Sequence, residues 1–468
     1  MIFTQAEFFI FFLLVYAGYR LIRNYDWQKN WLLAASCYFY AYCDWRFLSL
    51  LIFCIAVNYL CARRVEKHAE NRGRAKLWLT AAVVMSLVVL GVFKYYGFFV
   101  DSLRRLPVLK DWRFGTLHII LPLGISFYIF QCLSFSIDVY RRKCKVPGIR
   151  DFALYVAFFP KLVSGPIVRP GRFLTQLRTR RQITAIDTWL GIEQFVFGAF
   201  KKVFIADRLG YFVDEIFGSP QFYSGWTLWL ALTAYTLQIF CDFSGYSDMA
   251  IGSARMLGFH LDRNFNTPYI SLSITEFWRR WHISLSRWLR DYLYIPLGGN
   301  RRGRFRTYLN VMVTMLLGGL WHGASWNFVF WGAWHGFWQV VYKIFETPRR
   351  IVSGALWKPL YKLAAWAVTF VLVMIGWLFF KETSFSLAWV FAGRMFSLAR
   401  GVGWCEPFVV GCVAAMTIHH VAIYFDWGRR LRRPRPGSIY YWWLIATMVM
   451  LAVIFKPVDF QPFIYFQF

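Results

Sequence analysis

The segment from Leu320 to Gly336 reads LWHGASWNFVFWGAWHG and holds one histidine, His322, among apolar and aromatic residues. An imidazole has an ordinary pKa near neutrality, so it can accept or release a proton with little tuning. An ionisable group at membrane depth is costly, and this makes it a candidate functional group. The residues predict one of two roles: a catalytic or relay histidine that lines a cavity, or a neutral histidine hydrogen-bonded to a neighbouring helix.

A second histidine, His282, lies in the middle of the run 271–306, which reads SLSITEFWRRWHISLSRWLRDYLYIPLGGNRRGRFR. Apolar residues such as Trp281 interleave with arginines such as Arg279 and Arg280, so the run carries too much charge to span a membrane. We expect an amphipathic helix in the interface, with aromatics in the headgroup layer and arginines towards water. A polar residue such as His282 could there orient a substrate or line a tunnel.

Other ionisable residues in apolar segments are weaker candidates. His335 follows His322 by about 220° round a continuous helix, so the two should face different ways and His335 is predicted to be structural. Asp242 and Asp248 lie in QIFCDFSGYSDMAIG (238–252). Carboxylates at that depth could relay protons, bind a cation or bond to helix backbones.

Several common catalytic and binding motifs are absent from the sequence. There is no GxSxG elbow, HExxH, P-loop, or GxGxxG followed by a dinucleotide-binding unit. The nine cysteines include no CxxC pair, which favours small buried hydrophobes over disulfides or zinc ligands. We therefore predict no metal site and no bound cofactor.

The composition is that of a membrane protein. Of 468 residues, 58% are hydrophobic and 21% are aromatic. Apolar runs near the spanning length recur along the chain, and they predict an all-α polytopic bundle, one membrane domain over 1–468, with about 11 to 13 spans. The candidate spans are 6–21, 31–43, 46–60, 77–100, 117–139, 151–164, 189–206, 225–241, 308–320, 325–344, 361–380, 404–425 and 439–456.

The formal net charge of +29 lies mostly in short loops between these spans. That placement excludes nucleic-acid binding on a soluble face and indicates cytoplasmic loops under the positive-inside rule, with part of the charge available to an anionic substrate. The loop 101–113 is also basic, but this scheme places it on the outer side of the membrane, against the positive-inside rule. The N-terminal run carries its first basic residues after the apolar stretch, which predicts a retained span. The loops assigned to the cytoplasm are 61–76, 141–150, 169–181, 298–306 and 427–437.

Two segments are interrupted in ways that disfavour simple crossings. Segment 151–164 runs into Pro160, Gly165 and Pro166, and segment 31–60 is broken by Asp44 and Arg46. Such interruptions at membrane depth are tolerated where protein or a water-filled cavity receives the freed backbone groups, so re-entrant or broken helices around a cavity are expected. The residues alone are compatible with a membrane transferase that takes an anionic cytosolic donor and with a transporter.

Four long motifs resemble the membrane-bound O-acyltransferase (MBOAT) family, most closely its bacterial branch that acetylates exopolysaccharides. The resemblance covers most of the chain in order and is strong from about residue 120 to 340, with a further likeness at PFIYFQF (462–468). The motifs are FFPKLVSGPIVRP (158–170), QIFCDFSGYSDMAIGSARMLGF (238–259), NFNTPYISLSITEFWRRWHISLSRWLRDYLYIPLGGNRRG (264–303) and WHG (321–323).

The resemblance implies a helical bundle around a transmembrane tunnel with a histidine at its constriction. His322 matches the family's catalytic histidine and His282 its second recurrent polar position. The chain would comprise N-terminal spans (1–115), a catalytic core (116–345) and C-terminal spans (346–468). The residues expected to bind substrate are Trp278, Arg279, Arg280, Trp321 and Asp242.

The resemblance also implies a donor and partners. Acetyl-CoA, a cytosolic polyanion, would make charge-assisted contacts with the Arg279–Arg306 stretch, and its thioester would reach His322 through the tunnel. Within the bacterial inner membrane, the acetyl group would pass to periplasmic partner proteins of the SGNH-hydrolase type in a polysaccharide synthesis complex surrounded by membrane lipid. The expected acceptor is an exported polysaccharide such as alginate or cellulose.

Two alternatives to this function stay open at this point. One is transfer of another acyl group, such as D-alanine from a carrier protein onto a cell-wall polymer, which would need a docking surface on the cytoplasmic side. The other is a transporter or channel without acyl chemistry at His322. Transporters often contain inverted repeats, and the sequence shows none.

Overall fold

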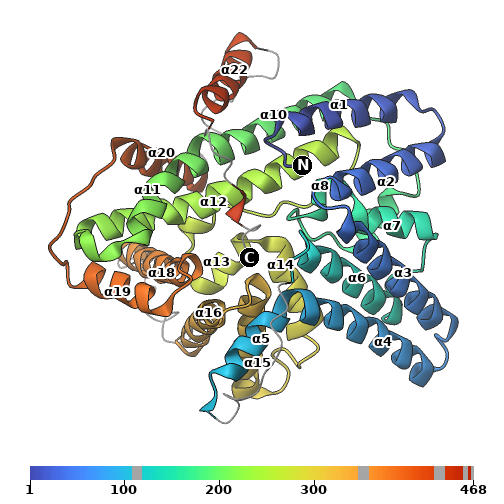
Figure 1. Cartoon of the computed structure of the whole chain (residues 1–468), viewed down its shortest axis with the longest axis horizontal. Helices are drawn as coiled ribbons and strands as arrows, with labels where there is room; N and C mark the ends of the chain where they lie inside the picture. The colour runs from blue at the N-terminus through green and yellow to red at the C-terminus, as the bar shows by residue number, and fades with distance from the viewer. Residues whose placement is uncertain (108–118, 346–357, 426–437, 457–461, 465–468) are drawn as a thin grey trace. The chain divides into compact units, whose positions relative to one another are not determined.

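The structure is a computed structural model that describes residues 1–107, 119–345, 358–425, 438–456 and 462–464 (Figure 1). The predicted basic loop 427–437 lies outside these residues, as do 108–113 of the loop 101–113 and the last four residues of PFIYFQF. Contacts divide the chain into two units, one formed by 1–195 and 247–262 and the other by 196–246 and 263–468. We describe each unit separately.

The first unit is built from helices joined by short turns. Side-chain oxygens start several of them: Asn24 accepts hydrogen bonds from the amides of Asp26 and Trp27, and Asn71 accepts one from Arg74. α3 packs against α4 and α6. The helices are α1 (Ala6–Leu21), α2 (Tyr25–Ala41), α3 (Arg46–Lys67), α4 (Arg72–Leu90), a π-helical turn (Gly91–Tyr95), α5 (Tyr96–Arg104), α6 (Ile125–Tyr140), α7 (Ile149–Ala157), α8 (Phe159–Leu162), α9 (Pro170–Gln176) and most of α10 (Ala185–Phe200).

Both interruptions predicted in this unit are present. α2 ends at Ala41, and Asp44 accepts a hydrogen bond from the Arg46 amide, where α3 begins. The stretch 151–164 is divided between the short helices α7 and α8, with an extended bend at Phe158. These breaks confirm that the apolar runs do not form simple continuous helices here.

The second unit holds both histidine motifs. It contains the end of α10 and the first 22 residues of the long helix α12, whose last turns belong to the first unit. Its elements are a π-helical turn (Lys201–Ala206), α11 (Asp207–Gly218), α12 (Gly225–Met256), α13 (Ile274–Arg280), α14 (Ile283–Leu289), a second π-helical turn (Arg290–Tyr294), α15 (Gly303–His322), α16 (Trp326–Ile344), α18 (Lys358–Lys381), α19 (Phe385–Phe396), α20 (Pro407–Tyr424) and α22 (Ile439–Ile454).

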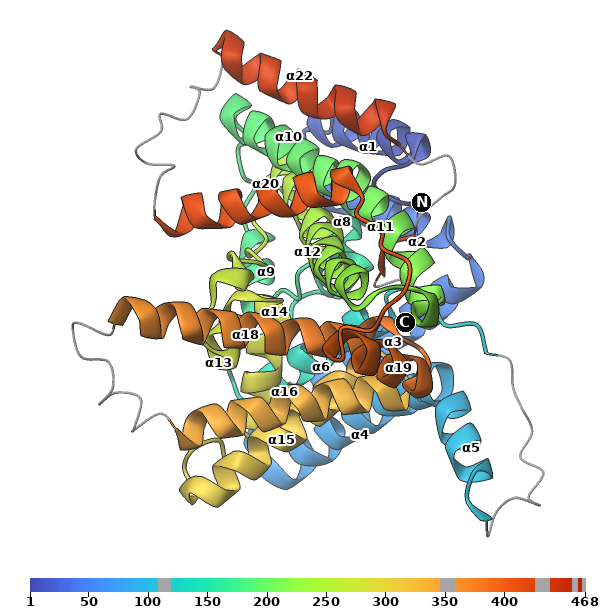
Figure 2. The same ribbon diagram turned by 90° about the vertical axis from the view of Figure 1, so that its left-hand side faces the viewer.

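α15 and α16 form a closely packed hairpin, visible side by side in Figure 2, with α18 against α16. Glycines allow the close approach. A Cβ at Gly319 would lie 2.2 Å from the Phe328 carbonyl oxygen, and one at Gly332 would lie 2.4 Å from that of Met315. Small residues let helix backbones approach closely in this way where two helices pack within a membrane. The hairpin turn immediately follows His322, so this packing fixes where the histidine lies.

The all-α membrane character is confirmed. Three helical stretches among the described residues are long and apolar enough to cross a membrane: Arg46–Lys67, Arg72–Arg104 and Pro359–Lys381. The number of crossings and the tunnel stay predictions. Shorter apolar helices are Ile125–Tyr140, Phe385–Phe396, Pro407–Ile423 and Ile439–Ile454.

The run 271–306 does not form the single amphipathic helix that we predicted, and its place relative to the membrane stays a prediction. The run is divided into α13, α14 and the second π-helical turn, and His282 separates the first two with a left-handed φ of 41°. Its aromatic side chains lie in the protein core, where Trp281 and Leu285 are fully buried. The amphipathic pattern was read correctly, but its apolar side packs against α12, α16 and α18 side chains instead of lipid headgroups.

Candidate active site

His322 ends α15, and its imidazole lies in an aromatic cluster within the second unit. Its ring meets those of Trp321, Trp331 and Phe380 nearly edge to face, with ring centroids 4.9, 4.9 and 5.3 Å away. Only 5% of His322 is exposed. The structure therefore buries His322 among aromatic rings, as the aromatic-rich segment predicts.

His282 joins the same cluster from the turn between α13 and α14. It is fully buried, and its ring lies edge-on to Phe243 of α12 at 4.7 Å and 6.0 Å from Trp321. Trp321 thus contacts both histidines that the sequence singled out. The fold brings both histidines to the indole ring of Trp321.

The expectation that His322 and His335 face different ways is wrong, because the helix between them is not continuous. α15 ends at His322 and α16 begins at Trp326, so the chain reverses direction. The ring of Trp331 contacts His335 at 4.8 Å and His322 at 4.9 Å. Three histidines therefore share one aromatic cluster, which we call the histidine cluster: His282, His322 and His335 with Trp321, Trp331, Trp377 and Phe380.

A cationic cleft of about 460 Å³ lies beside this cluster in the same unit. Trp278 lines the cleft and also contacts the Trp331 ring at 5.5 Å, so one side chain belongs to both regions. Three buried polar atoms in its wall, Thr275 Oγ1, Trp278 Nε1 and Gln339 Nε2, have no hydrogen-bond partner among the described residues. The basic side chains of the cleft are Arg279, Arg287, Arg290 and Lys343.

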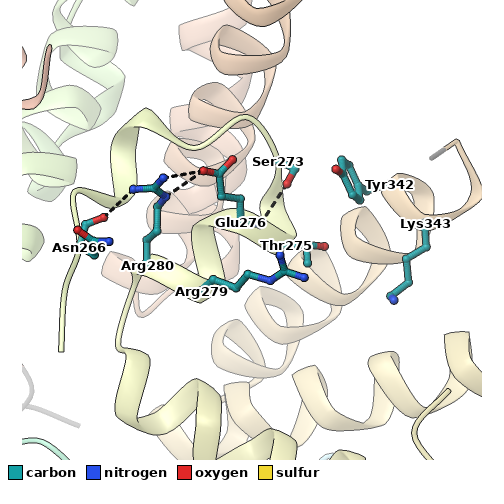
Figure 3. Close-up of a pocket in the computed structure, with 8 residues that line it drawn as sticks. All are labelled: Asn266, Ser273, Thr275, Glu276, Arg279, Arg280, Tyr342 and Lys343. Carbon is teal, nitrogen blue, oxygen red and sulfur yellow. Dashed lines mark hydrogen bonds and ion pairs between the residues drawn. The ribbon is translucent and has the colours of Figure 1, made fainter. Parts of the chain in front are cut away.

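A neighbouring polar pocket of about 510 Å³ shares Thr275, Arg279 and Lys343 with the cleft (Figure 3). Arg280 is held at one side of it by Glu276, with the two charged groups 2.9 Å apart. Arg279 is turned away from that pair, towards Thr275. Among the described residues, neither Arg279 nor Lys343 forms an ion pair, so both cations are available to an anionic ligand.

A capping box orients the helix that carries Trp278 and Arg279. The Ser273 hydroxyl accepts a hydrogen bond from the Glu276 amide at 3.1 Å, and the Glu276 carboxylate accepts one from the Leu272 amide at 3.0 Å. This reciprocal pair satisfies backbone donors at the start of α13. Adjacent residues on a helix point about 100° apart, so Trp278 faces the core while Arg279 faces solvent.

Asp242, predicted to bind substrate, lies in a buried ion pair. Its carboxylate accepts a hydrogen bond from the Lys202 ammonium at 2.6 Å and one from the Ile464 amide at 3.0 Å. Lys202 also pairs with Asp207 at 2.8 Å. A role of Asp242 in substrate binding stays a prediction, and these contacts show that it anchors the C-terminal residues 462–464.

The model of the membrane-bound O-acyltransferase family matches residues 32–385, which include the histidine cluster and the cationic cleft. The chain belongs to the MBOAT family. This membership excludes the alternative of a transporter or channel without acyl chemistry, and the protein is a membrane-embedded O-acyltransferase.

The chain is similar to curated relatives that are named for O-acetylation. The chain is 44% identical to "Probable alginate O-acetylase AlgI" of Azotobacter vinelandii, over 85% of this chain and 78% of the relative. It is 39% identical to the protein of the same name from Pseudomonas putida, over 100% of both chains. Identity to the peptidoglycan O-acetyltransferase of Helicobacter pylori is 35%, over 86% of this chain and 81% of the relative.

Several residues near this site were missed from the sequence. Trp331 lies four residues before His335 on one helix face, and that spacing could have indicated a shared environment. Lys343 is the basic residue at the end of a predicted span. Asn264 begins the motif 264–303, but its contact with His282 could not be predicted, because that contact depends on how two segments of the chain fold together.

Proposed function

We propose that the protein transfers acetyl groups from cytosolic acetyl-CoA, through chemistry at His322, for O-acetylation of an exported polysaccharide of the alginate type. The observation that carries the proposal is the adjacency of two regions in one unit: a buried cluster around His322 and a cationic cleft, joined by Trp278. The relatives named above support acetyl as the acyl group and alginate as the polymer class.

The cleft suits a donor with a phosphorylated head and an uncharged arm. Arg279 and Lys343 offer charge-assisted contacts to phosphates, which are stronger than neutral hydrogen bonds. The buried Trp278 indole and Gln339 amide offer neutral donors to the amide oxygens that the arm of CoA carries. The thioester at the end of that arm would then meet the histidine cluster.

At His322, two balanced routes lead to the ester. As general base, the imidazole takes the proton of an acceptor hydroxyl while that oxygen attacks the thioester carbonyl, and the CoA thiolate leaves and is protonated. As nucleophile, an imidazole nitrogen attacks the carbonyl and the CoA thiolate leaves. The hydroxyl oxygen then attacks the acetyl-imidazole, the ester forms, the imidazole is released, and the hydroxyl proton ends on the CoA thiolate. Both routes need a neutral imidazole.

The size of the acceptor polymer determines how the acetyl group would reach it. A polysaccharide is too bulky for a tunnel through the protein, so a relay to a periplasmic partner of the SGNH-hydrolase type is part of the proposal. The protein would then lie in the bacterial inner membrane, where a cytosolic donor and an exported acceptor meet.

The test measures polymer-bound acetate in cells that carry His322→Ala or His322→Gln, with protein levels in the membrane checked. Loss of acetate at normal protein level is expected. His419→Gln serves as the matched control, because His419 is exposed on α20, and it should retain acetylation. Retained acetate in the His322 variants would remove this residue from the chemistry and overturn the proposal.

D-alanyl transfer is the second candidate, and a specific similarity supports it. The chain is 27% identical to the teichoic acid D-alanyltransferase of Bacillus subtilis, over 63% of this chain and 79% of the relative. Purified protein incubated with either acetyl-CoA or a D-alanyl carrier protein separates the two. We expect CoA release from the first and no transfer from the second.

A further inference from the structure

The side chain of Asn264 gathers three contacts at a single oxygen. Its Oδ1 accepts hydrogen bonds from the Ser284 amide at 3.2 Å and from the Ser284 hydroxyl at 2.9 Å, and it lies 3.2 Å from His282 Nδ1. Asn264 is 1% exposed. Asn264 and its two partner residues all lie within the second unit.

These contacts fix the chemical identity of each atom. A backbone N–H can only donate, so the Asn264 atom that faces the Ser284 amide must be the oxygen and not the amide nitrogen. An amide oxygen only accepts, so the His282 Nδ1 that faces it must carry a hydrogen. A neutral imidazole has one N–H, which leaves the lone pair of His282 on Nε2.

The structure assigns Asn264 as the positioning residue that holds His282 in the Nδ1–H form and thereby makes its Nε2 a hydrogen-bond acceptor. In this form Nε2 cannot donate to the developing oxyanion of the thioester carbonyl. On the nucleophile route at His322, Nε2 of His282 can accept a hydrogen bond from the hydroxyl that attacks the acetyl-imidazole. The catalytic role of Nε2 rests on the proposed function. The assignment of the tautomer rests only on the hydrogen bonds of Asn264.

Burial supports the neutral form of the ring. His282 lies between two helices too short to span a membrane, and burial lowers the pKa of its imidazole to about 3. The side chains with ring contacts given above are uncharged: Phe243 of α12, Trp321 of α15, and Asn264 with Ser284. The ring therefore stays neutral at physiological pH, and the choice of tautomer decides its hydrogen-bonding role.

Backbone contacts show that the arrangement is built into the turn. The Ile283 amide donates to the Asn264 carbonyl at 2.9 Å, and the Asn266 amide donates to the Arg280 carbonyl at 2.9 Å. The first residue flanking a helix normally caps it with its own side chain. His282 occupies that position before α14 but makes no cap, because Asn264 caps the Ser284 amide instead. The imidazole of His282 therefore does not cap the helix. Asn264 Oδ1, which does, also contacts His282 Nδ1.

The strained backbone at His282 agrees with a functional role. Its φ of 41° lies in the left-handed region, which a residue with a side chain rarely adopts. Such conformations persist where surrounding contacts over-determine them, and they cluster at active sites. Here the hydrogen bonds from the two flanking residues, Trp281 to Phe277 and Ile283 to Asn264, hold the turn.

The kinetic test uses Asn264→Leu and Asn264→Asp in the full-length protein, with CoA release from acetyl-CoA as the assay. Asn264→Leu removes the acceptor, and we expect kcat to fall by about 10- to 100-fold with little change in the KM for acetyl-CoA, as for loss of an orienting partner of an imidazole. Ser284→Ala removes the hydroxyl that donates to Asn264 but keeps Asn264 Oδ1 as the acceptor for His282 Nδ1. The fall in kcat should therefore be smaller than in Asn264→Leu.

Asn264→Asp provides a readout that a purely structural role would not move. A carboxylate accepts the same three hydrogen bonds, so the turn should fold, but its charge stabilises the imidazolium and raises the pKa of His282. Below that raised pKa, Nε2 carries a proton and cannot accept. We therefore expect the acid limb of the kcat–pH profile to move to higher pH, with activity restored relative to Asn264→Leu at alkaline pH. An unmoved acid limb would overturn the assignment.

The tautomer can also be measured without activity. Nitrogen-15 and carbon-13 spectra of labelled histidine distinguish Nδ1–H from Nε2–H, and His282→Gln identifies the signal of this residue. We expect Nδ1–H in the wild type and a shifted population in Asn264→Leu. An Nε2–H ring in the wild type would overturn the inference, whereas retained transfer in His322→Gln would overturn the proposed function and leave the tautomer result intact.

Discussion

The histidine cluster and the cationic cleft lie side by side in one unit but offer opposite environments. In the cluster, His322 is 5% exposed and surrounded by aromatic rings, whereas in the cleft Arg279, Arg287 and Arg290 are exposed. A single short helix, α13, contributes to both, because Trp278 faces inwards and Arg279 outwards. Two adjacent residues of one helix thus line two regions of opposite character.

The physical consequence concerns which kinetic constant each region controls. An apolar surround strengthens local electrostatic interactions and keeps an imidazole neutral, so changes in the cluster should act on the chemical step. Exposed cations are screened by water and salt and attract a charged donor in ground and transition states alike, so changes in the cleft should act on KM. Four variants test this separation.

The largest effect is expected for His322→Gln. We expect kcat to fall by about 10²- to 10⁴-fold, the usual contribution of general acid–base catalysis. Donor affinity should be unchanged, because the imidazole lies in the cluster and not in the cleft. Calorimetric titration of the purified variant with CoA checks this, and a large loss of CoA affinity would break the separation of the two regions.

The double substitution Arg279→Ala with Lys343→Ala should come second. Loss of two charge-assisted contacts is expected to raise the KM for acetyl-CoA by about 10- to 100-fold with kcat nearly unchanged. The KM of the wild type should also rise with salt more steeply than that of the variant. The matched control is Arg63→Ala with Lys67→Ala on the exposed side of α3, which removes the same charge elsewhere and should leave KM unaltered.

Trp278→Phe sharpens the comparison, because Trp278 belongs to both regions. The ring is kept and only the buried indole N–H is lost, so the KM for acetyl-CoA should rise by about 2- to 10-fold, the value of one hydrogen bond. Steady-state kinetics measure both constants. A fall in kcat with constant KM would instead assign Trp278 to the chemistry of the cluster.

Much of this arrangement could be predicted from local sequence signals. The apolar segment 308–320 predicted a helix that ends just before His322, and Asp44 with Arg46 marked a true helix break. Both signals act within a few residues, where capping and hydropathy decide the structure. The segments 361–380 and 439–456 likewise coincide with α18 and α22 to within a few residues.

The errors came from contacts between distant segments. Periodicity placed Trp281 at a lipid interface, because an amphipathic pattern cannot distinguish a membrane surface from the protein's own core. The same reasoning turned His335 away from His322, since a helical wheel carries no information about the reversal after Gly323. Asn264 reaches His282 only through the folded turn, so no local pattern could reveal it.

The smallest effect is expected for His335→Leu. His335 is fully buried, and neither ring nitrogen has a hydrogen-bond partner among the described residues. Replacing unpaired polar atoms with an apolar side chain is nearly neutral or stabilising, so the melting temperature should hold or rise and acetyl transfer should stay within about threefold of the wild type. Thermal unfolding and CoA release measure the two. Loss of transfer in a well-folded variant would show that His335, on the other side of Trp331 from His322, also takes part in acetyl transfer and does not only pack in the core.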